Sequence, residues 1–147
     1  MRVFVDADAC PVTDIAVKVC SRAEIACFLL CDTAHQIFRE PAQTLGFDKG
    51  ADSVDYAIAN RVTGADIVIT QDYGLASMCL ARTEHVLHQD GWAYTPDNIG
   101  ALLFQRHASR EYRAAGGRTK GPSKRKQEQD KAFAAAFERL LQQSVQG

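Results

Sequence analysis

The chain has 147 residues, 46% hydrophobic and 24% charged, which is typical of one folded domain that needs neither a disulfide nor a structural metal ion. Because 17 Lys and Arg residues nearly balance 18 Asp and Glu residues, the net charge of −1 by itself indicates neither a nucleic-acid nor a membrane surface protein. That average conceals an acidic body, with a net charge of −7 over residues 1–103, and a basic tail, with +6 over residues 104–147.

Short apolar segments alternate with helical patterns along the chain. We predict strands over residues 2–5, 24–31, 66–70, 84–88 and 92–94. We predict helices from about Pro11, over 52–64 with Gly64 closing the helix, and over 73–81, 97–113 and 130–142. Residues 33–49 show no clean period and predict a long connection with one short helix. The alternation indicates an α/β fold with a mostly parallel sheet.

The last part of the chain differs in kind. Residues 114–129 hold three glycines, one proline and five basic residues without a hydrophobic anchor, which predicts a flexible basic loop within a single domain spanning 1–147. The helix that follows carries apolar side chains on one face and is expected to dock on the body. These side chains are Phe133, Phe137, Leu140 and Leu141.

Neither a membrane location nor a disulfide framework is indicated. No apolar run approaches the length of a membrane span, and the N-terminus reaches Asp6 too soon for a signal peptide, so we expect a cytoplasmic protein without a membrane partner. The five cysteines are odd in number and include no Cys-x-x-Cys pair, so they predict no standard zinc site either. We expect most of them to be reduced core side chains.

Aspartates follow two of the predicted strands. Asp6 and Asp8 come directly after the first, and Asp72 comes directly after the strand over 66–70. If those strands are neighbours, the three carboxylates share the edge of the sheet where functional groups of parallel α/β proteins gather. Asp52 and Asp55, three residues apart, open the preceding helix on roughly one face. Carboxylates gathered in this way repel one another strongly unless a divalent cation neutralises their charge. Ligation by oxygen atoms alone favours Mg²⁺ or Mn²⁺.

Helix capping is the competing explanation for most of these acids. Asp8, Asp52 and Asp72 could each cap the helix that follows. Asp55 lies inside its helix, where capping cannot explain it. Asp66 stands at the opposite, amino end of its strand, so we leave it out of the site.

Three segments of the chain resemble the signature segments of one bacterial family. They are Asp6-Ala7-Asp8-Ala9-Cys10-Pro11-Val12, Gly50-Ala51-Asp52-Ser53-Val54-Asp55 and Asp66-Ile67-Val68-Ile69-Thr70-Gln71-Asp72-Tyr73-Gly74-Leu75-Ala76. With Gly121-Pro122 and the last helix, they make nearly the whole chain similar to the uncharacterised YaiI/YqxD family, also called UPF0178 or DUF188. That family is in turn similar to PIN-like and NYN nuclease domains.

The resemblance implies a PIN-like α/β fold and a metal-dependent nuclease that acts on RNA or single-stranded nucleic acid. It implies metal-binding roles for Asp6 and Asp72, with Asp8 as an additional ligand and either Asp52 or Asp55 as the acid of the helix. We take Asp6, Asp8 and Asp72 as the catalytic candidates. A cation there would polarise a phosphodiester, lower the pKa of a bound water and stabilise the leaving oxygen.

Two other functions stay open. An Asp-x-Asp after the first strand also resembles haloacid-dehalogenase-like phosphatases, in which Asp6 would be the nucleophile and Asp8 the acid, with Thr33 binding phosphate and Asp72 binding metal. Against this, Cys10 stands where Thr or Val is usual, and the chain lacks room for a cap domain. The non-enzymatic alternative is an RNA-binding protein whose acids hold a structural or regulatory metal.

Basic residues crowd the segment over 106–131. Such a cluster can wrap a phosphate backbone with salt-sensitive affinity, although a solvated tail is its commoner meaning. The residues expected to bind nucleic acid are Arg106, Arg110, Arg118, Lys120, Lys124, Arg125 and Lys126. Tyr73, Trp92 and Tyr112 could stack on bases, with Trp92 favoured as a core residue instead. The sequence does not indicate an oligomeric state.

Overall fold

The computed structural model describes residues 1–33, 36–47, 53–121 and 123–146. Strands and helices alternate along these residues, so the predicted α/β class is confirmed. The strands are β1 (Arg2–Asp6), β2 (Ala26–Asp32), β3 (Gln43–Phe47), β4 (Ile67–Ile69), β5 (His85–Leu87) and β6 (Ala93–Tyr94). The helices are α1 (Thr13–Arg22), α2 (Ser53–Arg61), α3 (Tyr73–Leu80), α4 (Pro96–Ala114) and α5 (Gln127–Gln146). No helix in the described part of the chain is long and apolar enough to cross a membrane.

The strands form one sheet in the order β3-β2-β1-β4-β5-β6. Every pairing is parallel except that of β6, which runs antiparallel to β5. The chain moves outward from β1 to β3 and then returns to the other side of β1 with β4. The strand order therefore reverses between β1 and β4, and open α/β sheets bind ligands beyond the carboxyl ends of their strands at such a point. This order is consistent with the PIN-like fold that the resemblance implies.

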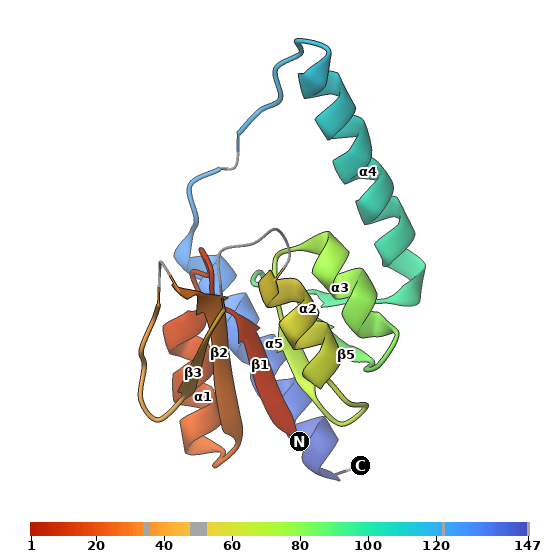
Figure 1. Ribbon diagram of the computed structural model, residues 1–147. Helices are drawn as coiled ribbons and strands as arrows, with labels where there is room; N and C mark the ends of the chain where they lie inside the picture. The colour runs from red at the N-terminus through yellow and green to blue at the C-terminus, as the bar shows by residue number, and fades with distance from the viewer. Residues whose placement is uncertain (34–35, 48–52, 122, 147) are drawn as a thin grey trace.

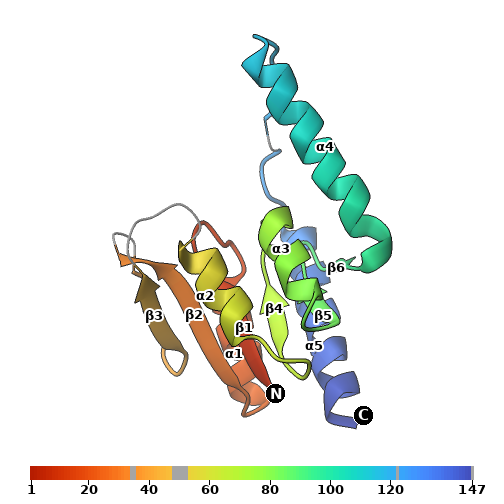
Figure 2. The ribbon, with the colours of Figure 1, turned by 45° about the vertical axis from the view of Figure 1, so that its right-hand side comes forward.

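Helices cover both faces of the sheet, with α1 and α5 on one face and α2 and α3 on the other (Figures 1 and 2). Successive strand side chains point to opposite faces, so Val3 and Val5 join the core under α1 and α5, whereas Phe4 joins the core under α2 and α3. Phe133 and Phe137 of α5 are fully buried in the first of these cores. The expectation that the last helix docks on the body is confirmed.

Three details of the predicted elements are wrong. Residues 33–49 contain a strand, β3, which pairs in parallel with β2 at the edge of the sheet. Its side chains are at most half-buried, so they leave no apolar run in the sequence. Helix α2 ends at Arg61, before Gly64, because the turn from Thr63 to Asp66 begins there. Helix α5 is longer at both ends than the predicted 130–142 and takes up the last residues of the expected loop.

Helix α4 stands away from the sheet, and residues 115–121 and 123–126 lie between its tip and the body (Figure 1). Its start is fixed by a capping box, in which Thr95 and Asn98 each accept from the other's backbone N–H. Ile99 and Leu102 pack against the core, but no residue of α4 is buried, and Phe104 is 73% exposed. We call α4 together with residues 115–121 and 123–126 the arm.

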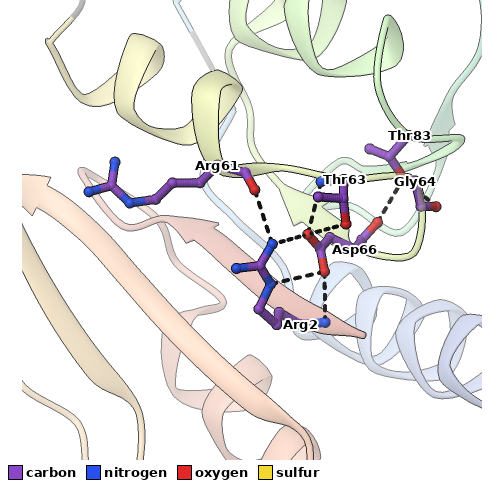
Figure 3. Close-up of polar contacts among 6 residues, drawn as sticks. All are labelled: Arg2, Arg61, Thr63, Gly64, Asp66 and Thr83. Carbon is purple, nitrogen blue, oxygen red and sulfur yellow. Dashed lines mark hydrogen bonds and ion pairs between the residues drawn. The ribbon is translucent and has the colours of Figure 1, made fainter.

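Asp66 lies at the amino end of β4 and joins three segments (Figure 3). Its carboxylate accepts from the backbone and guanidinium of Arg2, at 3.0 Å and 2.7 Å, and from the backbone and hydroxyl of Thr63. Thr83 donates to the Asp66 carbonyl at 2.7 Å. Burial raises the pKa of Asp66, but the donors on Arg2 and Thr63 outweigh it and hold the pKa below its usual value. Asp66 is thus structural, as its position at the amino end suggested.

Candidate functional site

Asp6 and Thr70 lie side by side where β1 and β4 end. Val5 pairs with Ile69, and the hydroxyl of the buried Thr70 donates to Asp6 Oδ2 at 2.9 Å. Thr70 also accepts from the backbone N–H of Asp72 at 3.0 Å. The condition on which the site depended, that the first strand and the strand before Asp72 are neighbours, is therefore met.

Asp6 is the centre of a group of acids. The pKa of Asp6 is raised to about 7, and burial is the largest cause. The hydrogen bond from Thr70 lowers this pKa, whereas the charges of Asp55, Asp8 and Asp72 raise it. These acids come from the loop after β1, from α2 and from the start of α3. The fold thus brings acids from separate parts of the sequence into electrostatic contact at the point where the strand order reverses.

Asp8 is not a helix cap. The N-cap of α1 is Val12, which makes no side-chain hydrogen bond there. Asp8 Oδ1 instead accepts from the backbone N–H of Asp32 at 3.3 Å, at the end of β2. Its carboxylate therefore lies on the same edge of the sheet as Asp6.

Asp72 is a helix cap, as the alternative interpretation held, and also part of the acid group. Its Oδ1 accepts from the backbone N–H groups of Gly74 and Leu75, at 2.8 Å and 3.2 Å, and so caps α3. The guanidinium of Arg106, from the middle of α4, reaches the same oxygen at 3.1 Å. The arm is thus tied to the edge of the sheet that carries the acids.

The remaining predicted ligands belong to α2. Asp55 is half-buried in the first turn of that helix, whereas Asp52 lies outside the described residues, so its role stays a prediction. Within the described ranges, no three His, Cys, Asp or Glu side chains are close enough to form a metal-binding group. The donor set still fits a hard cation, because every acid around Asp6 offers carboxylate oxygens.

Three arginines of α4 follow one another along one face of the helix. Arg106, Arg110 and Arg113 are spaced four and three residues apart, which places them on the same side. Arg106 contacts Asp72, while Arg110 and Arg113 are exposed farther out along the arm. The returning segment adds further exposed cations, which are Arg118, Lys120, Lys124 and Lys126.

Arg125 differs from the other predicted nucleic-acid contacts. Its guanidinium donates to Asp130 at 2.7 Å, to Asp90 at 2.6 Å and to the carbonyl of Gln89 at 2.7 Å. These contacts join the turn after β5 to the start of α5. No local pattern predicts these contacts, because Asp90 lies 35 residues from Arg125 in the sequence.

The three aromatic candidates differ in exposure. Trp92 stacks on His88 with ring centroids 4.2 Å apart and meets Tyr94 edge-on, so it is a packing residue. Tyr73 is half-buried at the start of α3 and also meets Tyr94. Tyr112, on the arm, is 57% exposed.

Comparison with known proteins places the chain in a family. A model described as "Uncharacterized BCR, YaiI/YqxD family" matches residues 4–143. The chain belongs to the YaiI/YqxD family. A UPF0178 protein of Exiguobacterium sibiricum is 48% identical over 96% of both chains, and one of Clostridium acetobutylicum is 42% identical over 96% of this chain and 97% of its own. No solved structure matches. The resemblance to this family is confirmed. The names of the family and of these relatives do not state an activity.

Proposed function

We propose that this member of the YaiI/YqxD family is a metal-dependent nuclease that cleaves RNA or single-stranded nucleic acid beyond the carboxyl ends of β1 and β4. The observation that carries the proposal is the half-buried Asp6 at the point where the strand order reverses, whose carboxylate feels the charges of Asp8, Asp55 and Asp72. The capping of α3 explains the place of Asp72, but capping explains none of the other three.

A divalent cation supplies what this group of acids lacks. Buried carboxylates are costly unless a counter-charge pairs with them, and without one the pKa of Asp6 rises to about 7. Mg²⁺ or Mn²⁺ would be held by Asp6, Asp8 and Asp72, with Asp55 or Asp52 from the helix. When bound, it would polarise a phosphodiester and activate a water.

The chain's own residues have distinct tasks under this proposal. The Thr70 hydroxyl fixes the orientation of Asp6 through its 2.9 Å hydrogen bond. Arg106 stands at the acid group and can donate to a phosphate oxygen, because guanidinium groups pair well with phosphate. Arg110 and Arg113 continue the positive row outward. A strand lying along the arm would thus pass its phosphates over the acids.

The phosphatase alternative is less well supported by the residues of this chain. Cys10 stands where such phosphatases usually have Thr or Val, and the chain lacks room for a cap domain. The non-enzymatic alternative predicts binding without turnover. Both are distinguishable outcomes of the experiment below.

The test incubates the purified protein with Mn²⁺ and an end-labelled single-stranded RNA. We expect cleavage, and we expect Asp72→Asn to reduce it by about 100-fold or more, since a metal ligand is lost. Asparagine is as good a helix cap as aspartate, so α3 should stay intact. Asp97→Asn, an exposed acid in the first turn of α4, is the matched control and should cleave like the parent.

Three results would contradict the proposal. Equal cleavage by the parent and Asp72→Asn would mean that the activity comes from elsewhere. Hydrolysis of a small phosphomonoester with a trapped phospho-Asp6 would establish the phosphatase. Tight RNA binding without cleavage in either Mg²⁺ or Mn²⁺ would establish the non-enzymatic function.

A further inference from the structure

Helix α4 has two different faces. Ile99 and Leu102 pack against the core, and Arg106 reaches the acid group, so these side chains mark the face that is turned toward the body. Phe104 lies on the opposite face and is 73% exposed. Three more exposed side chains lie beside it at helical spacing, and they are Ala101, Ala108 and Tyr112. We call these four residues the outer stripe.

The outer stripe is an apolar surface that the described part of the chain leaves uncovered. Helices in proteins are stabilised mainly by the packing of an apolar face, and a short helix alone in water is marginal. Yet α4 has no buried residue and stands away from the body (Figures 1 and 2). The ring of Tyr112 is already held in place, because it lies against Gly117, where a Cβ would collide with the ring. The stripe is therefore a preformed surface for a partner.

The large and small side chains along the stripe complement those of a second copy. When two copies of α4 run antiparallel about a two-fold axis near residue 106, nearly the whole helix overlaps and residue 104 of each copy faces residue 108 of the other. The ring of Phe104 then packs over the small Ala108 of the second copy. Residue 112 faces residue 100, so Tyr112 meets Gly100, which has open space around it. A parallel pair would instead set Phe104 against Phe104.

The charges of α4 also favour the antiparallel arrangement. Its first half, residues 96–105, carries the single charge of Asp97, whereas its second half, residues 106–114, carries three arginines and Glu111. An antiparallel pair sets the acidic half of each helix beside the basic half of the other, and it also opposes the two helix dipoles. A parallel pair would bring like charges together. Charge and side-chain size thus select the same arrangement.

We propose that the chain forms a homodimer in which the outer stripes of two arms pack antiparallel. The row of Arg106, Arg110 and Arg113 lies on the other side of α4 and stays free for a nucleic-acid backbone. The dimer would therefore present two arginine rows and two acid groups related by a two-fold axis. The pairing needs neither a metal ion nor nucleic acid, so its test is independent of the proposed nuclease.

The test measures the mass of the full-length protein by sedimentation equilibrium, with EDTA and a reducing agent present. Its concentration is varied from about 1 µM to about 1 mM, because a small interface gives a weak dimer. We expect the mass to rise from the 16.1 kDa of one chain toward twice that value. Phe104→Glu should stay monomeric, since it places a charge at the centre of the stripe. Tyr56→Glu, which changes an aromatic side chain of α2 that is 57% exposed, is the matched control and should associate like the parent.

Exchanging the two central side chains tests the arrangement itself. Phe104→Ala alone should raise the Kd of the dimer about tenfold or more, since interfaces concentrate their binding energy in central aromatic residues. Ala108→Phe alone should also raise the Kd, because two rings then compete for one space. The double variant Phe104→Ala/Ala108→Phe again sets a large residue opposite a small one, so its Kd should return close to the parent's. Both positions are exposed, so the circular dichroism of each variant should match the parent's.

Three results would overturn the proposal. A parent that stays monomeric at every concentration would show that the stripe does not bind a second copy. A dimer that persists in Phe104→Glu would show that another surface forms it. Tighter association in Ala108→Phe, or a double variant as weak as Phe104→Ala, would contradict the antiparallel pairing.

Discussion

The carboxyl group of Asp6 affects the stability of the folded protein and is also the central acid of the proposed site. Thr70 holds its Oδ2, while burial and the acids on Asp55, Asp8 and Asp72 disfavour its charged form. Under the proposed function, a cation bound at Asp6 would offset the cost of ionising its carboxyl group. The sign and size of that cost can be measured without any metal.

Asp6→Asn should stabilise the protein in EDTA at pH 8 by roughly 2 to 4 kcal/mol, since each unit of pKa shift corresponds to about 1.4 kcal/mol. The pKa rises from 3.8 to about 7 on folding, so the folded state holds a proton that the unfolded state has released. The parent's free energy of unfolding should therefore fall as pH rises from about 4 to about 7 and then level off. Urea unfolding of both proteins across this range measures it, and parallel pH profiles would contradict it.

Asp66 shows the opposite case, a buried acid whose charge is fully compensated. It is 1% exposed and accepts from Arg2 and Thr63. Asp66→Asn replaces a carboxylate oxygen, which accepts hydrogen bonds, by an NH₂ group that would face the donors of Arg2 and Thr63. Because the Arg2 side chain is 41% exposed, the loss should cost about 1 to 3 kcal/mol. Thermal unfolding should show a clearly lower Tm, with Mn²⁺-dependent cleavage retained below that temperature. Loss of cleavage in a fully folded variant would show that Asp66 belongs to the site.

At the scale of elements, patterns with a strong period were predictable and long-range partners were not. The run from Ile67 to Ile69 is wholly buried, so its sequence is distinctive, whereas β3 at the sheet edge is at most half-buried and left no signal. That Asp6, Asp8 and Asp72 lie at the same edge of the sheet could be predicted once β1 and β4 were taken as neighbouring strands. The contact of Asp8 with the backbone of Asp32 depends on the β1–β2 register, which hydrophobic patterning does not specify.

The turn after β5 and the start of α5 form a close contact that no local pattern reveals. Gly91 has φ of 93°, and a Cβ there would lie 2.6 Å from the carbonyl oxygen of Ala132. Arg125 joins the same two elements through Asp90 and Asp130. Arg125 thus has a structural role, unlike the exposed cations of the same segment.

The arm should therefore respond to two kinds of substitution in different ways. Replacing Arg118, Lys120, Lys124 and Lys126 with Ser should weaken RNA binding regardless of base sequence. Each lost phosphate contact should also reduce the slope of log affinity against log salt by about 0.7. Tm should stay near the parent value, because these side chains are exposed. Arg125→Ser should instead lower Tm, since it leaves Asp90 and Asp130 unpaired.

Fluorescence anisotropy at several salt concentrations, with thermal unfolding alongside, measures both effects. If the fourfold variant keeps the parent's affinity and salt slope, the segment is a solvated run. The nucleic-acid assignment would then lose its main electrostatic support.

For the whole molecule, the charge asymmetry of −7 against +6 corresponds to a division in space. Asp6 and Asp72 lie where β1 and β4 end, and the arm stands out from the body (Figure 2). The arm carries most of the exposed cations described above. Arg106 and Asp72 join the two parts at 3.1 Å. Because an acidic body repels phosphate, the proposed function would need both a cation and the arm to bring a nucleic-acid backbone to the acids.

The most direct test of this account is the effect of Mn²⁺ on Tm in the parent and in the Asp6→Asn/Asp72→Asn double variant. We expect Mn²⁺ to raise the parent's Tm, because a ligand at about 100 times its Kd stabilises the folded state by roughly 2.7 kcal/mol. The double variant should show no rise, since it lacks both acids at the strand ends. An equal rise in both proteins, or none in the parent, would contradict the assignment of a cation to Asp6 and Asp72.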